Sequence, residues 1–484
     1  MEITQIVSVS DFRGILPEIV LLATSLIILT LEMVSKSLRR VMVPVGLAGY
    51  AAAFSIIFRT FSSEEVLFGG MLTVTRYTAF FDMLYFAVGS ASLLIARKYL
   101  ERKEGQLRGE YLALTLFATM GMMFMTRAND LVMVFLGLEL LSLSLYVLIG
   151  FLRHDVASNE GGIKYLLMGA FTTGFFVFGT ALVFGATGST NYERIAAAVS
   201  DGNVLSGTLL SMGIGLLLIG FSFKVALVPF HMWSPDVYQG APTPVTAFLG
   251  TAPKAAGFGT LIKVFLVAFP AQIGGWQDLL WILAALTMIV GNVTALLQTN
   301  VKRMLAFSSV AHAGYLLMGV VALDRGGVSG VLFYLAVYCA MNFGAFAGIS
   351  LVEKGEKGVN LSDYRGLAFR HPWLAASLAL FMISLAGFPP TAGFVAKYAV
   401  FTAAVNQGYL WLTVIAVLTT LVSVYYYVRL IVQMYMQEEE TVLPTFVLRE
   451  AAVLLAILAA IVIGLGVNPS LLLNGAVKAA EVLL

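Results

Sequence analysis

The chain has 484 residues, of which 59% are hydrophobic and 12% are charged, whereas about a quarter of the residues of an ordinary soluble domain are charged. Its formal net charge is +2, and its one cysteine, Cys339, excludes disulfides within the chain and cysteine-ligated iron–sulfur clusters. No glycine-rich dinucleotide fingerprint or P-loop is present, so we expect neither a nucleotide site nor a redox centre in this chain.

Apolar runs of about 20 residues, the length that crosses the hydrocarbon core of a bilayer, recur from Ile15 to the C-terminus. They predict an all-α polytopic membrane protein with about fourteen transmembrane helices and almost no soluble domain. The expected spans are residues 15–35, 41–60, 78–98, 110–126, 130–151, 161–186, 207–230, 242–268, 277–298, 303–323, 328–352, 373–403, 409–436 and 450–467.

The placement of the basic residues predicts the orientation of the chain. If the N-terminus lies outside, the loops after the odd-numbered helices face the cytoplasm, and these loops with their flanks hold more than half of the 29 lysines and arginines. Lysine and arginine concentrate in cytoplasmic loops. We therefore expect both termini on the outer side, as an even number of helices requires.

Two of the expected spans contain helix breakers. The seventh carries Lys224 and then meets Pro229 and the loop HMWSPDVYQGAPTP, and the twelfth is split by AGFPPTAGF just before Lys397. Paired interruptions in the two halves of a membrane chain indicate an ion pathway built on an inverted repeat. We expect helices 1–3 in residues 1–108, a first repeat in 109–270, a second, inverted repeat in 271–436 and helix 14 in 437–484. The eighth span is a third candidate for irregular backbone, because prolines precede Lys254: Pro242, Pro244 and Pro253.

Five charged residues stand inside the apolar spans: Glu139, Lys164, Lys224, Lys254 and Lys397. A charge at the centre of a bilayer costs about 2.5–3.5 kcal/mol on insertion scales, so together they cost about 10–15 kcal/mol before any pairing. Such residues usually line ion or proton pathways. We therefore interpret them as functional.

Glu139 belongs to a polar stripe on an otherwise apolar helix, since Ser142 and Tyr146 follow it by three and seven residues. The stripe should face Lys224 one helix pair later. An opposite charge within about 4–6 Å would keep both groups ionised, which predicts a Glu139–Lys224 pair.

Lys164 and Lys254 lack an acidic partner at depth, although Glu160 could pair with Lys164 near the surface. Burial disfavours the charged form of a lysine, so such amines can exchange protons near neutral pH. His312 carries Ser308 and Tyr315 on its face of the helix, and histidine titrates readily. With water in the gaps, Glu139, Lys224, Lys164, Lys254, His312 and Lys397 form a predicted midplane proton relay.

Structural interpretations compete with this relay. Lys164 can be a lysine near a helix end that reaches to the interface, and Glu139 can be a static tie between helices. His312 can be a core residue bonded to Ser308. Asp82 is interpreted as a buried hydrogen-bonding acid, and His231 as interfacial or at a pathway mouth rather than as a metal ligand. The run of Tyr425, Tyr426 and Tyr427 indicates an interfacial aromatic belt.

At these residues the sequence resembles the antiporter-like membrane subunits of respiratory complex I, which are related to Mrp-type sodium/proton antiporter subunits. The resemblance covers nearly the whole chain. Lysine at 397 and the lack of a long C-terminal extension distinguish it from the M and L paralogues, and PDVYQGAPTPV with TAPKAAGFG favours the N type. The resemblance to the family rests on the stretches FLGLELLSLSLY, IKYLLMGA, FKVALVPFHMWSPDVYQGAPTPVTAFLGTAPKAAGFG, ALLQTNVKRMLAFSSVAHAGYLLMG and SLAGFPPTAGFVAKY.

The resemblance implies fourteen helices with two inverted five-helix repeats, Glu139 with Lys224 on the half-channel side, Lys164 and Lys254 as a central relay and Lys397 at the exit. It also implies a proton-translocating subunit in a bacterial cytoplasmic membrane. No cofactor is expected in this chain; NADH, FMN, iron–sulfur clusters and quinone would belong to partner subunits.

The expected partners are the neighbouring M-type subunit, the small K- and J-type membrane subunits and lipids, with no nucleic acid. Two other functions stay open, a cation/proton antiporter subunit of the Mrp type and a structural membrane module. Four lysines without four acids at depth argue against the structural module.

Overall fold

The computed structural model describes residues 8–61, 63–103, 107–270, 272–353, 358–438 and 449–484. These residues are mostly helical, with one antiparallel hairpin of the strands β1 (Glu65–Leu67) and β2 (Leu72–Val74), in which Glu65 pairs with Val74. Twelve helices in the described part are long and apolar enough to cross a membrane. The prediction of an all-α polytopic membrane protein is confirmed. The exact count of fourteen and the repeat symmetry stay predictions.

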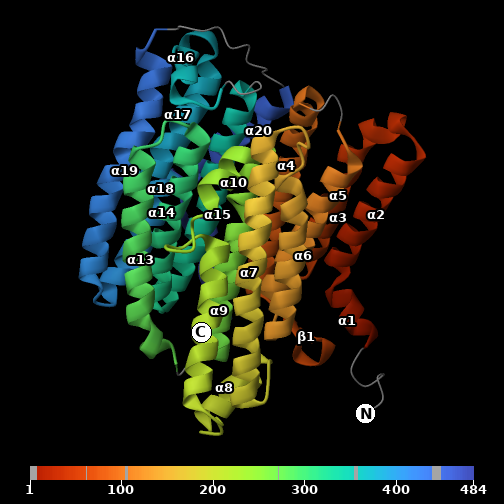
Figure 1. Cartoon of the computed structure of the whole chain (residues 1–484), viewed down its shortest axis with the longest axis vertical. Coiled ribbons are helices and arrows are strands. Elements are labelled where there is room, and N and C mark those ends of the chain that lie inside the picture. Colours follow the sequence, from red (N-terminus) through yellow and green to blue (C-terminus); the bar gives the residue numbers. More distant parts are fainter. Residues whose placement is uncertain (1–7, 62, 104–106, 271, 354–357, 439–448) are drawn as a thin grey trace.

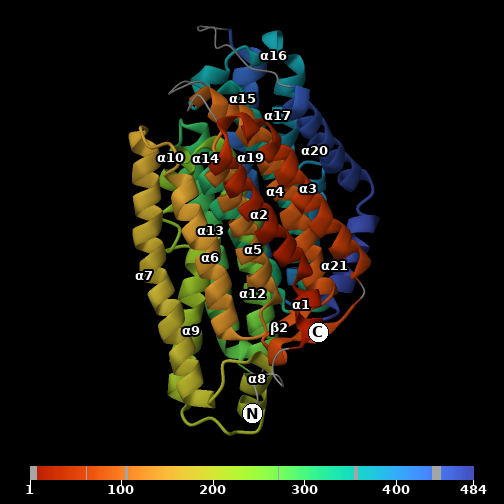
Figure 2. The ribbon, with the colours of Figure 1, turned by 90° about the vertical axis from the view of Figure 1, so that its right-hand side faces the viewer.

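The long helices run side by side along the long axis of the molecule (Figures 1 and 2). They are α2 (Leu16–Val34), α3 (Arg39–Arg59), α4 (Arg76–Lys103), α5 (Gly109–Arg127), α6 (Leu131–Ile149), α7 (Val156–Thr187), α9 (Gly207–Val225), α13 (Ile273–Leu296), α14 (Val301–Ala322), α15 (Arg325–Val352), α19 (Leu410–Met436) and α20 (Arg449–Val467). Short helices at their ends are α1 (Val9–Gly14), α8 (Tyr192–Ser200), α16 (Leu367–Arg370) and α21 (Ser470–Ala480).

Several long helices begin at a side chain that caps their first turn. Asp130 accepts a hydrogen bond from the backbone N–H of Val132 at 2.8 Å at the start of α6, and Asp155, Asn300 and Asp324 do the same for α7, α14 and α15. Such caps satisfy donors that the helix itself leaves free. These short polar residues therefore fix where the apolar runs of the sequence become helices.

Burial divides the helices into an inner and an outer set. The inner set comprises α14 and α15, which are buried along almost their whole length, and the segment Thr243–Ala268 that precedes α13. The outer helices α2, α7, α19 and α20 expose apolar side chains such as Phe171 and Leu421. Exposed apolar faces of this extent are what a bilayer or a neighbouring membrane subunit covers.

The predicted break of the seventh span is confirmed and lies earlier than expected. Helix α9 ends at Val225, because Ala226 adopts a left-handed φ of 60° and Pro229 cannot continue the hydrogen-bond ladder. The expected span 242–268 is divided as well. The chain instead forms α10 (Ser234–Gly240), α11 (Thr243–Leu249), α12 (Ala252–Lys263) and the π-helical turn η4 (Val264–Ala268).

The twelfth span is also broken where predicted. Helix α17 (Pro372–Ala386) ends at Gly387, whose φ of +89° suits glycine, and α18 (Ala392–Asn406) begins after the two prolines. Each break thus exposes the carbonyl end of a helix in the interior of the bundle.

Candidate functional site

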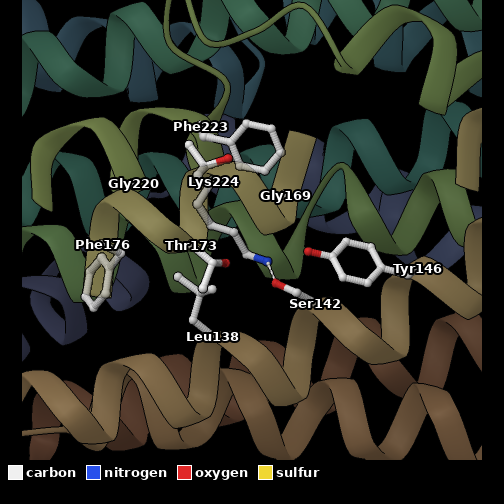
Figure 3. Close-up of a pocket in the computed structure, with 10 residues that line it drawn as sticks. Leu138, Ser142, Tyr146, Gly169, Thr173, Phe176, Gly220, Phe223 and Lys224 are labelled. Carbon is white, nitrogen blue, oxygen red and sulfur yellow. Dashed lines mark hydrogen bonds between the residues drawn. The ribbon is translucent and has the colours of Figure 1, made fainter. Parts of the chain in front are cut away.

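Lys224 lies in the last turn of α9, with 5% of its surface exposed. Its ammonium donates a hydrogen bond to Ser142 Oγ on α6 at 3.0 Å. Figure 3 shows this side chain extended across a small cavity toward Ser142, with the Tyr146 hydroxyl beside it. The cavity has a volume of about 10 Å³, which is about the room that one water molecule needs. A proton donor, two hydroxyls and room for water therefore meet at this point.

Glu139 lies one turn before Ser142 on α6 and is half-buried. Its Oε1 accepts a hydrogen bond from Thr173 Oγ1 of α7 at 2.8 Å. Among the residues that the structure describes, Glu139 and Lys224 form no ion pair with each other, so the predicted direct pair is replaced by an arrangement in which Ser142 receives the amine. The reason is that Thr173 draws the carboxylate toward α7.

Lys254 is on α12 and 4% exposed. Its Nζ donates to the backbone oxygen of Ser309 at 2.5 Å and to Ser309 Oγ at 2.7 Å. Ser309 Oγ also shares a hydrogen bond of 3.1 Å with the Tyr238 hydroxyl. No carboxylate pairs with Lys254 among the described residues.

His312 is 1% exposed on α14, one turn after Ser308. Its Nδ1 shares a 2.7 Å hydrogen bond with the Tyr334 hydroxyl, and its Nε2 shares one of 3.1 Å with the Tyr427 hydroxyl. Tyr427 in turn contacts Ser308 Oγ. The structural alternative of a direct bond between His312 and Ser308 is therefore not what forms, because the Tyr427 hydroxyl lies between the two groups.

Lys397 is 4% exposed on α18 and donates to the backbone oxygen of Ala386 at 3.0 Å. Ala386 is the last residue of α17, so the ammonium caps the carbonyl end of the broken helix. A cation is stabilised there, because the carbonyl end carries partial negative charge. The break and the buried lysine thus form one unit.

These residues form a continuous row through shared neighbours. The Tyr338 ring lies 5.7 Å from Lys254 Nζ and 5.1 Å from the His312 ring. The Tyr315 ring lies 5.8 Å from the His312 ring and 5.0 Å from Lys397 Nζ. At the other end, the Lys224 side chain packs near Gly257, one turn after Lys254 on α12. The structure therefore brings Lys224, Lys254, His312 and Lys397 together in the interior.

Lys164 does not belong to this interior row. Its side chain is 41% exposed on α7 and forms ion pairs of 2.5 Å with Glu160 and 2.6 Å with Asp236. The prediction that Lys164 is buried without an acidic partner at depth is wrong, because α10 brings Asp236 to it from 72 residues away in the chain. Arg303 binds the same carboxylate at 2.6 Å. Burial alone raises the pKa of Asp236, but Lys164 and Arg303 outweigh it and hold the pKa below its ordinary value.

The sequence reasoning missed a second buried charge cluster. Arg127 is fully buried and forms ion pairs of 2.7 Å with both Asp82 and Glu18. Lys263, 4% exposed, donates to Thr73 Oγ1 at 2.7 Å and to the backbone oxygen of Arg127 at 3.2 Å. Asp82 is the buried acid that was expected. Arg127 and Lys263 stand near the ends of their spans, so the sequence alone places them at the membrane flank.

The sequence interpretation of the tyrosine run is corrected. Tyr426 and Tyr427 are buried, at 1% and 0% exposure, whereas Tyr425 is 62% exposed, so the run is not a uniform interfacial belt. One face of α19 instead turns two hydroxyls inward, toward Asn292 and His312. His231 is 8% exposed and its ring contacts the Phe307 ring, and its position at the interface or at a pathway mouth stays a prediction. The described residues contain no group of three His, Cys, Asp or Glu side chains that could hold a metal ion.

Comparisons with known proteins agree with one another. A family model described as NADH:quinone oxidoreductase/Mrp antiporter, TM, matches residues 128–423. The chain is 45% identical to NADH-quinone oxidoreductase subunit N of Trichlorobacter lovleyi over 100% of both chains. It is 46% identical to the subunit N of Salinibacter ruber over 84% of this chain and 81% of that one.

Solved structures show the same relation. A chain of respiratory complex I from Thermus thermophilus with bound aureothin superposes with a TM-score of 0.82 at 33% identity, over 95% of this chain and 98% of that one. A chain of the Mrp complex from Dietzia sp. DQ12-45-1b superposes with a TM-score of 0.87 at 20% identity, over 98% of each chain, which shows likeness of fold alone.

Proposed function

The chain belongs to the N-subunit family of NADH-quinone oxidoreductase, within the wider group of NADH:quinone oxidoreductase and Mrp antiporter membrane subunits, and on that premise we propose that it translocates protons in such a complex. Electron transfer then takes place in partner subunits, which hold the NADH, FMN, iron–sulfur and quinone sites. Within the complex this chain is the membrane element that moves the charge.

One observation carries the proposal. Three buried ammonium groups, Lys224, Lys254 and Lys397, each bind a neutral oxygen in place of a carboxylate. A permanent counter-ion would trap the proton, because it stabilises the charged amine against desolvation. A hydroxyl or a carbonyl accepts the same hydrogen bond without adding a full charge. An amine held in this way can both lose and regain its proton.

The order of the row gives the path. A proton that leaves Lys224 is taken up by Lys254 through water near α12, and Lys254 becomes the ammonium while Lys224 becomes the amine. From Lys254 the proton passes to His312 across the space beside Tyr338, and from His312 to Lys397 beside Tyr315. Because neighbouring positive charges repel, protonation at one end favours release at the next site. Glu139 modulates the charge of Lys224 from α6, where it lies one helical turn before Ser142.

The arrangement of the breaks supports the two-repeat organisation. In residues 109–270, α9 ends just after Lys224, and in residues 271–436, α17 ends just before the helix of Lys397. We infer that the halves are inverted repeats whose broken helices face the same midplane row.

The expected setting is a bacterial cytoplasmic membrane, with an M-type subunit and the small K- and J-type subunits as neighbours and both termini on the outer side. Helix α1 and the end of α21 lie toward the same end of the molecule (Figures 1 and 2), which supports an even number of crossings between them.

The test uses the whole complex in closed vesicles. Lys224→Met and Lys254→Met keep length and apolar packing but remove the amine. We expect both variants to transfer electrons but to change the pH of the vesicle interior more slowly than the parent complex does. Lys478→Met on exposed α21 is the matched control and should pump normally. Normal pumping by an assembled Lys254→Met complex would overturn the proposal. Cation/proton exchange by the chain without electron transfer would favour the antiporter alternative.

A further inference from the structure

Proton transport along the row needs a route by which water can reach it from one face of the molecule. A large hollow of about 800 Å³ opens between the ends of α4, α6 and α15 and the starts of α7 and α14. The hollow lies at the end of the bundle opposite α8 (Figure 1). The predicted basic loops lie at the same end as the hollow. We name it the basin. Its lining mixes apolar with polar and charged side chains, and the polar and charged ones include Lys103, His154, Asp155, Glu160, Gln239, Asn300, Lys302, Glu353 and Asn360.

Glu353 lies on the wall of the basin at the end of α15 and is 6% exposed. Its Oε1 accepts a hydrogen bond from the Tyr99 hydroxyl at 3.0 Å and an ion-pair contact from Lys103 Nζ at 3.2 Å. Its Oε2 accepts a hydrogen bond from Thr243 at the start of α11. An acid that is buried and yet opens on a wide hollow is placed to exchange protons with water there.

Lys302 lies beside Glu353 in the first turn of α14 and is 2% exposed. Its Nζ donates to the backbone oxygen of Ala241 at 2.8 Å, and both residues line the basin. Ala241 follows α10, the helix that carries Tyr238. The short segment around α10 therefore forms part of the basin wall and also contacts the interior row through Tyr238.

Two hydroxyls lead from α10 to Lys254. The Tyr238 hydroxyl bonds to Ser309 Oγ at 3.1 Å, and Ser309 Oγ accepts from Lys254 Nζ at 2.7 Å. Thr246 on α11, one turn after Thr243, donates to the Tyr238 backbone oxygen at 3.1 Å. Among the described residues, the buried Tyr338 hydroxyl beside Lys254 makes no hydrogen bond to protein, so it is a further group that can bond to water.

We propose that the basin is a second proton intake, which supplies Lys254 directly in addition to the transfer from Lys224, with Glu353 as the acid that collects the proton and Tyr238 and Ser309 as the last hydroxyls before the amine. The Glu353 carboxylate takes one proton from basin water and becomes the carboxylic acid. Passage through hydroxyls and water returns it to the carboxylate, and the neutral amine of Lys254 becomes the ammonium. One proton is gained and one is lost, with no other reactant. This inference rests on the proposed function.

The charges around the basin set the resting charge of Glu353. The groups that face Glu353 are Lys103, Arg102 and Tyr99 from α4, Lys302 from α14 and Tyr364. Burial by itself raises the pKa of Glu353, but Lys302, Lys103 and the two hydroxyl donors outweigh it and hold the pKa below its ordinary value. The acid is therefore a carboxylate in its resting state, and Lys103 and Lys302 beside it balance its charge.

The test compares Glu353→Gln with Glu160→Gln in the whole complex reconstituted in vesicles. Both residues line the basin, but Glu160 is 56% exposed and pairs with Lys164 at the rim. We expect Glu353→Gln to lower coupled proton transport at least about tenfold, since a positioned acid contributes about 10²- to 10⁴-fold to a proton transfer. Glu160→Gln should leave it unchanged, and Glu353→Asp should restore part of it.

An assembled Glu353→Gln complex that pumps at the parent rate overturns the inference. If that variant fails to assemble, Tyr238→Phe decides, because it keeps the ring and removes only the hydroxyl that meets Ser309. Loss of transport in Tyr238→Phe supports the intake, and normal transport overturns it. Loss of pumping in Lys254→Met together with normal pumping in Glu353→Gln and Tyr238→Phe would leave the proposed function standing and refute the intake alone.

Discussion

Replacement of Arg127 by methionine should destabilise the protein more than any exposed charge substitution. The side chain has no exposed surface and is bound by Asp82 on α4 and Glu18 on α2, so it ties three helices together. Arg127→Met leaves two carboxylates buried without a cation. Breaking a buried ion pair by removing one partner costs about 3–5 kcal/mol, because the remaining charge is uncompensated. That lowers the ratio of folded to unfolded chain by about 150- to 5,000-fold.

The measurement is reversible unfolding of the purified chain in mixed detergent micelles, followed by circular dichroism. Arg325→Met is the control, since Arg325 pairs with Glu481 at 3.3 Å while 64% exposed. An exposed pair contributes about 0–1 kcal/mol, so this variant should unfold close to the parent.

A triple variant distinguishes the charge from the shape. In Glu18→Gln, Asp82→Asn, Arg127→Met no full charge of the triad is left buried, and replacing all members of a buried ion network is often neutral or stabilising. We expect it to recover most of the stability that Arg127→Met loses. If Arg127→Met alone unfolds like the parent, or if the triple variant is less stable than the single one, the reasoning from uncompensated charge is refuted.

Three other predictions follow from local contacts. Asp236→Asn should lower the melting temperature at pH 7; because the pKa of Asp236 is depressed, its stabilisation is present above the ordinary value of 3.8 and the difference from the parent should vanish as the pH falls below it. Lys164→Met should keep most proton transport in vesicles, because the side chain is 41% exposed, and complete loss would return this residue to the relay. Gly393→Ala should destabilise the protein by about 1–3 kcal/mol, since its Cβ would lie 1.8 Å from the Ser384 oxygen, while Gly464→Ala, with no atom within 4 Å, should not.

The sequence predicted the features that depend on local chemistry. Apolar run length gives the membrane-spanning helices, and the prolines and glycines locate the breaks, because each restricts the backbone wherever it stands. Lys224, Lys254 and Lys397 could be recognised as buried, since no interfacial position lies within reach of a lysine in the middle of an apolar run. The predicted contact between the polar stripe of α6 and Lys224 is also present, although Ser142 makes it in place of Glu139.

The features that were missed depend on contacts distant in the chain. Asp236 reaches Lys164 only because α10 folds back against α7, and Arg127 meets Glu18 across 109 residues. Tyr427 lies two residues after the exposed Tyr425, and only the orientation of α19 decides which of the three consecutive tyrosine hydroxyls reaches His312. Composition and periodicity carry no information on such pairings. A charged residue near the end of an apolar run is equally compatible with a position on the surface and with one in a buried network.

The two kinds of buried charge in this chain differ in a way that separates stability from transport. Around Arg127, full charges of opposite sign meet at 2.7 Å, so every proton there is held and the helices are fixed. Along the row, the ammonium groups bind hydroxyls and backbone carbonyls: Lys224 binds Ser142, Lys254 binds Ser309, and Lys397 binds Ala386 at the carbonyl end of the broken helix. Partial charges at a helix end stabilise a cation by about 0.3–2 kcal/mol, far less than a buried carboxylate does. Helix breaks therefore let a lysine remain inside the bundle while its proton stays exchangeable, which an acid beside each lysine would prevent.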